Sequence, residues 1–188
     1  MHIESIQTGQ ARKVLISGRS VMTAIRKTGV SGPVAVRPLG LEGDEQADLT
    51  VHGGLEKAIY AYPVEHYPFW LAQRKAAGLS DIDDELPHGA VGENLTLSGL
   101  LEGEVWVGDV LRFSGCTLRV EQPREPCFKF NAAMGFNTAA KAMVQSGFCG
   151  FYLSVDTPGT LQAGESFTLM AGPRRVSIAQ RFKEKMFR

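Results

Sequence analysis

The sequence predicts a mostly β protein, folded as a closed or partly closed β-barrel with a few peripheral α-helices. Short apolar segments of strand length recur from one end of the chain to the other, and several of them alternate apolar with polar residues. Twenty-one glycines and nine prolines, above the usual proportion, supply turns between them. Strands this short and numerous favour a sheet closed or nearly closed on itself, because closure limits exposed edges.

Ten segments fit strands. Val34 and Val36 point to one side of their segment, and Leu118 and Val120 flank Arg119 in the same way. In the longest segment, Gly108-Asp109 indicates a bulge or a tight turn. The expected strands are 2–6, 13–16, 20–25, 33–37, 57–62, 94–97, 105–113, 117–122, 150–155 and 166–171.

Two helices interrupt the strands. Pro68 fits the first turn of a helix that runs to about Ala77, with Gly78 beyond its end. Asn137 is the expected N-cap of a second helix, which Gly147 ends. The segment 174–188 is basic and could form one amphipathic helix.

The length of 188 residues fits one domain, assigned to 1–172, followed by a basic tail at 173–188. A formal net charge of zero argues against a general binder of nucleic acid or of anionic membranes. We expect a cytoplasmic protein, because the chain has neither a signal peptide nor an apolar run of the ~20 residues that span a bilayer. Three cysteines without a CxxC pair make a disulfide framework improbable.

The segment 122–129 contains the cysteine best placed for chemistry. Pro123 and Pro126 make it a stiff loop at the end of a strand. Arg124 and Lys129 lie close to Cys127 in sequence, and cationic neighbours favour the thiolate, the form that attacks carbon or binds metal. The local residues fit a small buried hydrophobe equally well. Cys116 and Cys149 stand in strand-like surroundings and are expected to be structural.

A second segment, 43–57, combines paired glycines with a lysine. Gly53 and Gly54 allow backbone N–H groups to approach a ligand, and Lys57 adds a positive charge, so the segment could hold an anion such as phosphate. It is not a P-loop, because no GxxxxGK[ST] pattern is present. His52 alone is more typical of a hydrogen-bonded structural residue. The order His52, then Cys127, leaves a Cys–His hydrolase open.

Other titratable residues are weaker candidates for function. Asp81, Asp83, Asp84 and Glu85 are expected in a solvated loop, since the alternation of a calcium loop is missing. His66 does not begin a zinc motif, because the HExxH pattern is absent.

Nine motifs follow one another between about residues 9 and 172: 32–36, 39–44, 46–48, 51–54, 57–58, 62–67, 92–95, 108–109 and 122–127. In this order they resemble the MOSC domain family, named for the C-terminal domain of molybdenum cofactor sulfurase, and in particular its YiiM-type bacterial members. The ordered series is specific, whereas each motif alone is weak. YiiM-type chains commonly continue into a small three-helix domain, where this sequence has only 173–188.

The resemblance implies binding of molybdenum cofactor (molybdopterin), a pterin dithiolene that carries a phosphate. Cys127 matches the family's motif cysteine, whose thiolate is expected to bind molybdenum beside the dithiolene sulfurs. The candidates for the anionic end and the pocket wall are Lys57, Arg124, Arg37, Asn94, Gly53 and Gly54. Asp44 and His52 also match motif positions, and either could relay protons.

The activity that the resemblance implies is reduction of N-hydroxylated compounds, such as hydroxylamino-purine base analogues, with electrons from a separate flavoprotein or iron–sulfur protein. No flavin or nicotinamide motif is recognisable, and pyridoxal phosphate is not expected. Nucleic acid and membranes are not expected partners, and a homodimer is left open. The alternative is a carrier of molybdenum cofactor or sulfur that uses Cys127 without turnover. A metal-free hydrolase with Cys127 and His52 is a third interpretation.

Overall fold

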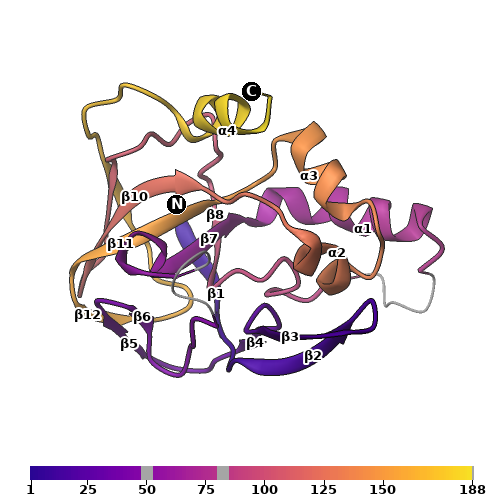
Figure 1. The fold of residues 1–188 in the computed structure, drawn as a ribbon. Helices are drawn as coiled ribbons and strands as arrows, with labels where there is room; N and C mark the ends of the chain where they lie inside the picture. The colour runs from indigo at the N-terminus through magenta and orange to yellow at the C-terminus, as the bar shows by residue number, and fades with distance from the viewer. Residues whose placement is uncertain (48–52, 80–84, 188) are drawn as a thin grey trace.

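The structure is a computed structural model that describes residues 1–47, 53–79 and 85–187 (Figure 1). Its main sheet has eight strands in the order β13-β9-β10-β11-β7-β8-β1-β4. Neighbouring strands run antiparallel except β7 and β8, which are parallel. In chain order the strands are β1 (His2–Thr8), β4 (Thr28–Gly29), β7 (Ile59–Pro63), β8 (Leu95–Ser98), β9 (Val110–Arg112), β10 (Thr117–Pro123), β11 (Phe151–Thr157) and β13 (Thr168–Met170).

Two smaller sheets complete the β-structure. One has the order β12 (Gly159–Leu161), β5 (Val34–Arg37) and β6 (Gly40–Leu41). The other is a hairpin of β2 (Arg12–Ile16) and β3 (Arg19–Thr23), which extends below α2 (Phe128–Met134) in Figure 1. The prediction of a mostly β protein with a few helices is therefore confirmed.

The described residues do not form a closed barrel. The sheet curls far enough for Ile3 N to donate to Glu165 O at 2.9 Å and for Gly164 N to donate to Ile3 O at 2.7 Å. The two edge strands of the sheet, β13 and β4, do not pair with each other. They are only three and two residues long, and they pair with β9 and β1 respectively. Of the two forms predicted, a closed or a partly closed barrel, the closed one is not found among the described residues.

The predicted helices form with small shifts at their ends. α1 (Tyr67–Ala76) carries Pro68 in its first turn, as predicted. α3 (Ala139–Ser146) has Thr138 rather than Asn137 as its N-cap and ends at Gly147, in a left-handed conformation. The basic C-terminal segment forms α4 (Ile178–Met186). Two short 3-10 helices are η1 (Leu55–Lys57) and η2 (Val64–His66).

Two segments differ from the sequence prediction. The residues after Pro126 form α2 instead of continuing a stiff loop, because both prolines precede the helix and Phe130 and Met134 bury one of its faces. In 105–113 only β9 forms a strand, and Trp106 makes an isolated β-bridge with Ser177. There, buried Asp109 accepts hydrogen bonds from Trp106 N at 3.1 Å and Gly172 N at 2.7 Å, which holds the predicted turn at Gly108-Asp109.

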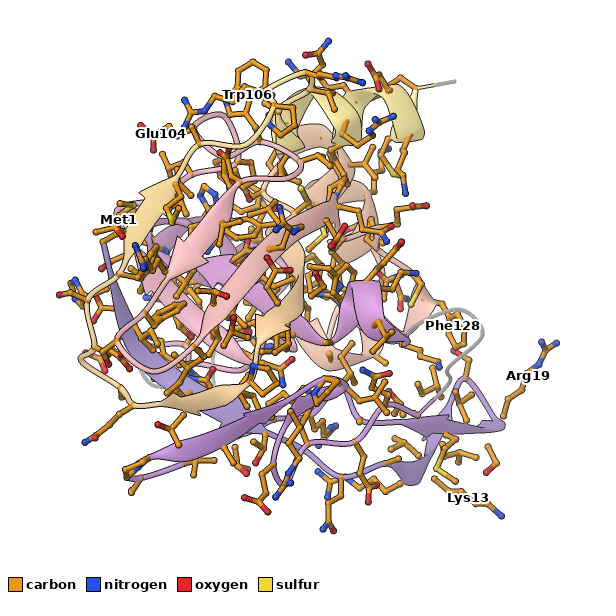
Figure 2. All side chains as sticks on the ribbon, turned by 90° about the vertical axis from the view of Figure 1, so that its left-hand side faces the viewer. Met1, Lys13, Arg19, Glu104, Trp106 and Phe128 are labelled. Carbon is orange, nitrogen blue, oxygen red and sulfur yellow. The ribbon has the colours of Figure 1, made fainter. Side chains whose placement is uncertain are left out.

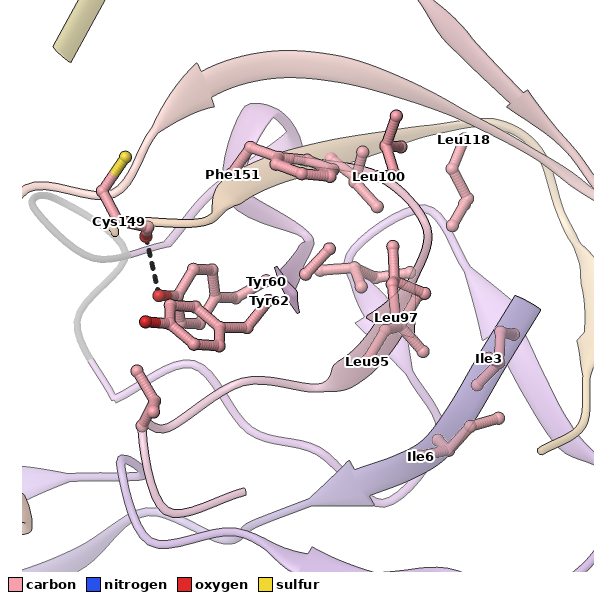
Figure 3. Close-up of a cluster of buried hydrophobic side chains, with 14 of the residues drawn as sticks. Ile3, Ile6, Tyr60, Tyr62, Leu95, Leu97, Leu100, Leu118, Cys149 and Phe151 are labelled. Atoms are coloured by element: carbon pink, nitrogen blue, oxygen red, sulfur yellow. Dashed lines mark hydrogen bonds between the residues drawn. The ribbon is translucent and has the colours of Figure 1, made fainter. Parts of the chain in front are cut away.

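The hydrophobic core lies along the main sheet, and Figure 3 shows part of it around Tyr60 and Tyr62. Tyr60 Oη donates to Cys149 O at 2.8 Å, the dashed contact in that view. Cys149 and Cys116 are buried, as expected for structural cysteines, and burial raises the pKa of Cys116 to about 12. Across the described ranges, no helix has the length and apolarity needed to cross a membrane.

Candidate functional site

A pocket opens where several separate parts of the chain meet. Residues of the segments 23–27, 44–47, 57–60, 92–94 and 124–129 contribute to its wall, together with Tyr152 near the start of β11. Its titratable side chains include Lys27, Asp44, Lys57, Tyr60, Arg124 and Tyr152. Four predicted site residues, Asp44, Lys57, Asn94 and Arg124, therefore line one pocket.

Lys27 and Asp44 form a nearly buried ion pair in this pocket. Lys27 Nζ lies 2.5 Å from Asp44 Oδ1, and the side chains are only 7% and 6% exposed. Burial lowers the pKa of Lys27, while Asp44, and then Glu93, act to raise it. The Asp44 carboxylate also accepts from Gly9 N at 2.7 Å, which fixes its orientation.

Arg124 is a buried cation stacked between aromatic rings. Its guanidinium carbon lies 4.9 Å from the centroid of the Tyr60 ring and 4.8 Å from that of Phe130. Arg124 Nη1 donates to Val91 O at 2.6 Å. Burial works to lower the pKa of Arg124, but its interactions with Tyr60 and Tyr152 outweigh burial and hold it above the ordinary value. The pocket therefore contains a permanent positive charge.

Cys127 lines a second cavity that adjoins the first. The two cavities share Lys57, Glu125 and Tyr152, and their volumes are about 100 Å³ and 280 Å³. Cys127 is half-buried and precedes α2, in an extended conformation. Lys57 Nζ lies 5.9 Å from the centroid of the Tyr152 ring, at the boundary between the cavities. A thiol and several cations thus line these two adjoining cavities, which together are called the groove.

The C-terminal helix α4 supports the loop that carries Cys127. Ile178 and Phe182 are buried and anchor the helix. Lys185 Nζ donates to Glu125 Oε1 and, at 3.4 Å, to Gln122 Oε1. These contacts join the basic tail to both ends of the segment 122–125, so the tail is expected to help position the Cys127 loop.

Asn94 lines the pocket, but its side chain is already engaged with backbone. Asn94 Oδ1 accepts from Tyr60 N at 3.0 Å, and Nδ2 donates to Gln7 O at 3.2 Å. Because Tyr60 is on β7 and Gln7 is on β1, the side chain links two strands of the main sheet. With an exposure of 4%, Asn94 acts here as a structural connector in the pocket wall.

The other predicted residues lie outside the groove or outside the described residues. Arg37 is exposed on β5 and pairs with Glu42 at 2.8 Å, away from both cavities. Gly54 N donates to Gln46 Oε1 at 2.7 Å at the start of η1, where a φ of +95° favours glycine, and Gly53 precedes it. His52 and the acidic residues Asp81, Asp83 and Asp84 lie outside the described residues.

Sequence reasoning missed Lys27, Tyr60 and Tyr152 as residues of the site. None of them belongs to a motif with a recognisable ligand. The segment after β3 carries Lys27, and β7 and β11 carry Tyr60 and Tyr152, so the fold brings them together from distant positions. The one available signal was that Lys27 ends a stretch rich in basic residues. Within the described ranges, no group of three His, Cys, Asp or Glu side chains could hold a metal ion by itself.

The model of the MOSC domain family matches residues 48–168, more than half of the chain. The chain belongs to the MOSC family. Within it, the chain is 36% identical to the protein YiiM of Escherichia coli over 158 residues, which are 84% of this chain and 68% of that protein. The resemblance to YiiM-type MOSC proteins is therefore confirmed.

A solved structure and a fungal protein are also similar to this chain. The crystal structure of YiiM from Geobacillus stearothermophilus matches this MOSC fold with a TM-score of 0.77 and 33% identity, covering 98% of this chain and 83% of that one. A protein of Gibberella moniliformis named "Reductase" is 32% identical over 169 residues, which are 89% of this chain but only 29% of that protein. In the fungal protein, the MOSC-like segment is thus part of a much longer chain.

Proposed function

We propose that this MOSC protein binds molybdenum cofactor in the groove described above and reduces N-hydroxylated compounds, with hydroxylamino-purines as the representative substrates. The observation that carries the proposal is the adjacency of the Cys127 thiol to a pocket lined by Lys27, Lys57 and Arg124. Membership of the family and the fungal relative named "Reductase" support the same conclusion.

The residues present fit molybdenum cofactor in size and in chemistry. The two adjoining cavities together reach the lower end of the roughly 300–1,000 Å³ that is typical of cofactor pockets. Cys127 supplies a half-buried thiol, a soft donor that suits a molybdenum ion held by other sulfur ligands. The cations and tyrosine rings beside it suit a phosphate-bearing pterin.

In this proposal Cys127 holds the metal, while Lys57 and Arg124 bind the anionic end of the cofactor. When bound, the cofactor supplies the two-electron chemistry that cleaves the N–O bond. The chain itself orients the substrate, limits water in the groove and delivers protons. The balanced reaction is R–NHOH + 2 e⁻ + 2 H⁺ → R–NH₂ + H₂O, so two protons must reach the substrate in each turnover.

The Lys27–Asp44 pair is the proposed proton source. Asp44, the predicted relay residue, lines the pocket and pairs with Lys27. Because the pKa of Lys27 is lowered, its Nζ is a better acid than that of an ordinary lysine. Lys27 Nζ can give a proton to the departing oxygen, and Asp44 holds Nζ in place for reprotonation. Lys27 therefore acts as a general acid in this scheme, with Asp44 as its positioning residue.

We expect turnover to fall at alkaline pH as Lys27 loses its proton, with a midpoint below the ordinary lysine value of 10.5. Lys27→Met should lower kcat by about 100-fold and remove this alkaline limb, a loss typical of an acid catalyst. Lys27→Arg keeps the charge and should move the limb to higher pH. Lys141→Met, on the exposed face of α3, is the control and should leave the profile unchanged. An unchanged profile in Lys27→Met would eliminate Lys27 as the acid.

Turnover of 6-hydroxylaminopurine with reduced methyl viologen distinguishes the reductase from a carrier. The cofactor-loaded protein should produce adenine over many cycles, and heat-released cofactor without protein should not. A carrier would retain molybdenum but consume at most one equivalent of substrate. Activity that survives without molybdenum and is abolished by thiol alkylation would instead favour a hydrolase or another thiol-dependent enzyme.

A further inference from the structure

The β2–β3 hairpin presents an unpartnered face to solvent. Among the described residues its two strands pair only with each other. Their side chains alternate: Val14, Ile16 and Val21 are half-buried, while Lys13, Leu15, Ser20 and Met22 are exposed, Leu15 to 74%. In Figure 2 Lys13 and Arg19 extend from one end of the molecule. The outer face therefore combines apolar and cationic side chains.

The hairpin concentrates positive charge in a chain with no net charge. Residues 10–27 contain five of the 20 Lys and Arg residues and no Asp or Glu. Arg12, Lys13, Arg19 and Arg26 are exposed. The fifth cation, Lys27, is paired with Asp44 in the pocket, and Glu45 accepts from Ala11 N at 2.8 Å at the base of the hairpin. The surface is complementary to an acidic partner.

This basic hairpin is connected directly to the groove. Thr23 ends β3, and Thr23, Ala24 and Ile25 line the pocket that contains Lys27. Lys129 Nζ, from α2, donates to Met22 O at 3.2 Å. Phe128, next to Cys127, is 55% exposed and lies on the same side of the molecule as Lys13 and Arg19 (Figure 2). A partner on the hairpin would lie beside the Cys127 loop.

We propose that the outer face of the hairpin, formed by Lys13, Leu15 and Met22 and bordered by Arg19 at the turn and by Phe128, is the docking surface for an acidic, flavin-carrying electron donor. This inference rests on the proposed function, because it answers how the reductase obtains its electrons. The donor's reduced flavin loses the two electrons that the N–O bond gains, and solvent supplies the two protons. Apolar contacts provide the centre of the docking surface, and the cations steer the donor's acidic face.

A protein donor fits this surface better than nucleic acid or a membrane does. On the hairpin a few cations lie beside exposed Leu15 and Met22, whereas nucleic-acid binding uses a broad basic face that tracks phosphates. A partner bound to the hairpin would lie beside the Cys127 loop, which would favour electron delivery but would not contribute to membrane attachment. Preferential binding of DNA or of membranes would therefore contradict the proposal.

The test uses flavodoxin, a small acidic flavoprotein, as the probe. Binding is titrated calorimetrically for wild type, for Lys13→Glu/Arg19→Glu, and for the control Arg112→Glu/Arg175→Glu, which makes the same charge change at exposed positions on β9 and before α4. We expect the hairpin variant to bind at least about tenfold more weakly at low salt, with the difference shrinking at high salt. Equal affinity of the hairpin variant and the control would overturn the docking site.

Turnover separates failure of this inference from failure of the proposed function. With reduced methyl viologen all three proteins should reduce 6-hydroxylaminopurine equally, because a small dye needs no docking surface. With reduced flavodoxin only the hairpin variant should be slow. No turnover with the dye would reject the reductase, while the binding titration would still test the hairpin. Tighter binding of a DNA duplex or of phosphatidylglycerol vesicles than of flavodoxin, or dimerisation lost in the hairpin variant, would assign the surface to another partner.

Discussion

Cys127→Ser is expected to reduce turnover of 6-hydroxylaminopurine by about 100-fold or more. Substituting a residue that only hydrogen-bonds to a metal ligand typically lowers metal affinity or activity by about 10–100-fold, and loss of a direct ligand should cost more. Serine is a harder and far less acidic ligand than the thiolate that it replaces. The fold should not change, because Cys127 is half-buried in the loop before α2 and belongs to no core cluster. The measurement is dye-coupled turnover together with the thermal midpoint of unfolding.

Cys116→Ser is the matched control for this substitution. Cys116 is 3% exposed and lies in the core, so a hydroxyl there should lower the free energy of unfolding by about 1–3 kcal/mol through burial of a polar group. Its turnover per folded molecule should match that of wild type. If Cys127→Ser kept full turnover, the assignment of Cys127 as the molybdenum ligand would be wrong.

Asn94→Ala is expected to be the most destabilising single change among the predicted site residues. It leaves Tyr60 N and Gln7 O buried without their side-chain partner, and each unsatisfied group costs about 1–3 kcal/mol. We therefore expect a loss of roughly 2–4 kcal/mol in the free energy of unfolding, measured by urea denaturation. Asn94→Asp should recover part of it, because Oδ1 can still accept from Tyr60 N.

Arg37→Ala provides the contrast for Asn94. The ion pair between Arg37 and Glu42 is 64% and 60% exposed and should contribute less than about 1 kcal/mol. Because Arg37 lies away from both cavities, its removal should also leave cofactor content unchanged. A stability loss in Arg37→Ala as large as that in Asn94→Ala would contradict this division between a buried connector and a surface ion pair.

Local sequence predicted most of the strands, α1, α3 and the C-terminal helix α4. Alternation and the placement of Pro68, Gly78 and Gly147 are encoded within a few residues of each element. Closure of the sheet was not predictable in this way. It depends on whether residues 164–167 reach β1, and that long-range contact follows from the curl of the whole sheet. The helix α2 was missed because the prolines before it dominated the local pattern.

The site was predictable only where a motif carried it. Cys127, Arg124, Lys57 and Asp44 fall in matched motifs, and the structure places them around one groove. Lys27 has no such motif, and its role depends on the distant Asp44. Arg37 is the opposite case: its charge suggested an anion site, but the structure places it on the surface, outside both cavities.

The most direct test of the central claim is molybdenum per chain, measured by elemental analysis after mild purification from a host that makes the cofactor. Wild type and Cys127→Ala are compared, each before and after reconstitution with released cofactor. The account predicts about one molybdenum per chain in wild type and little in the variant, because the thiolate is the protein's soft ligand for the metal. Equal molybdenum in both proteins, or none in wild type after reconstitution, would contradict it.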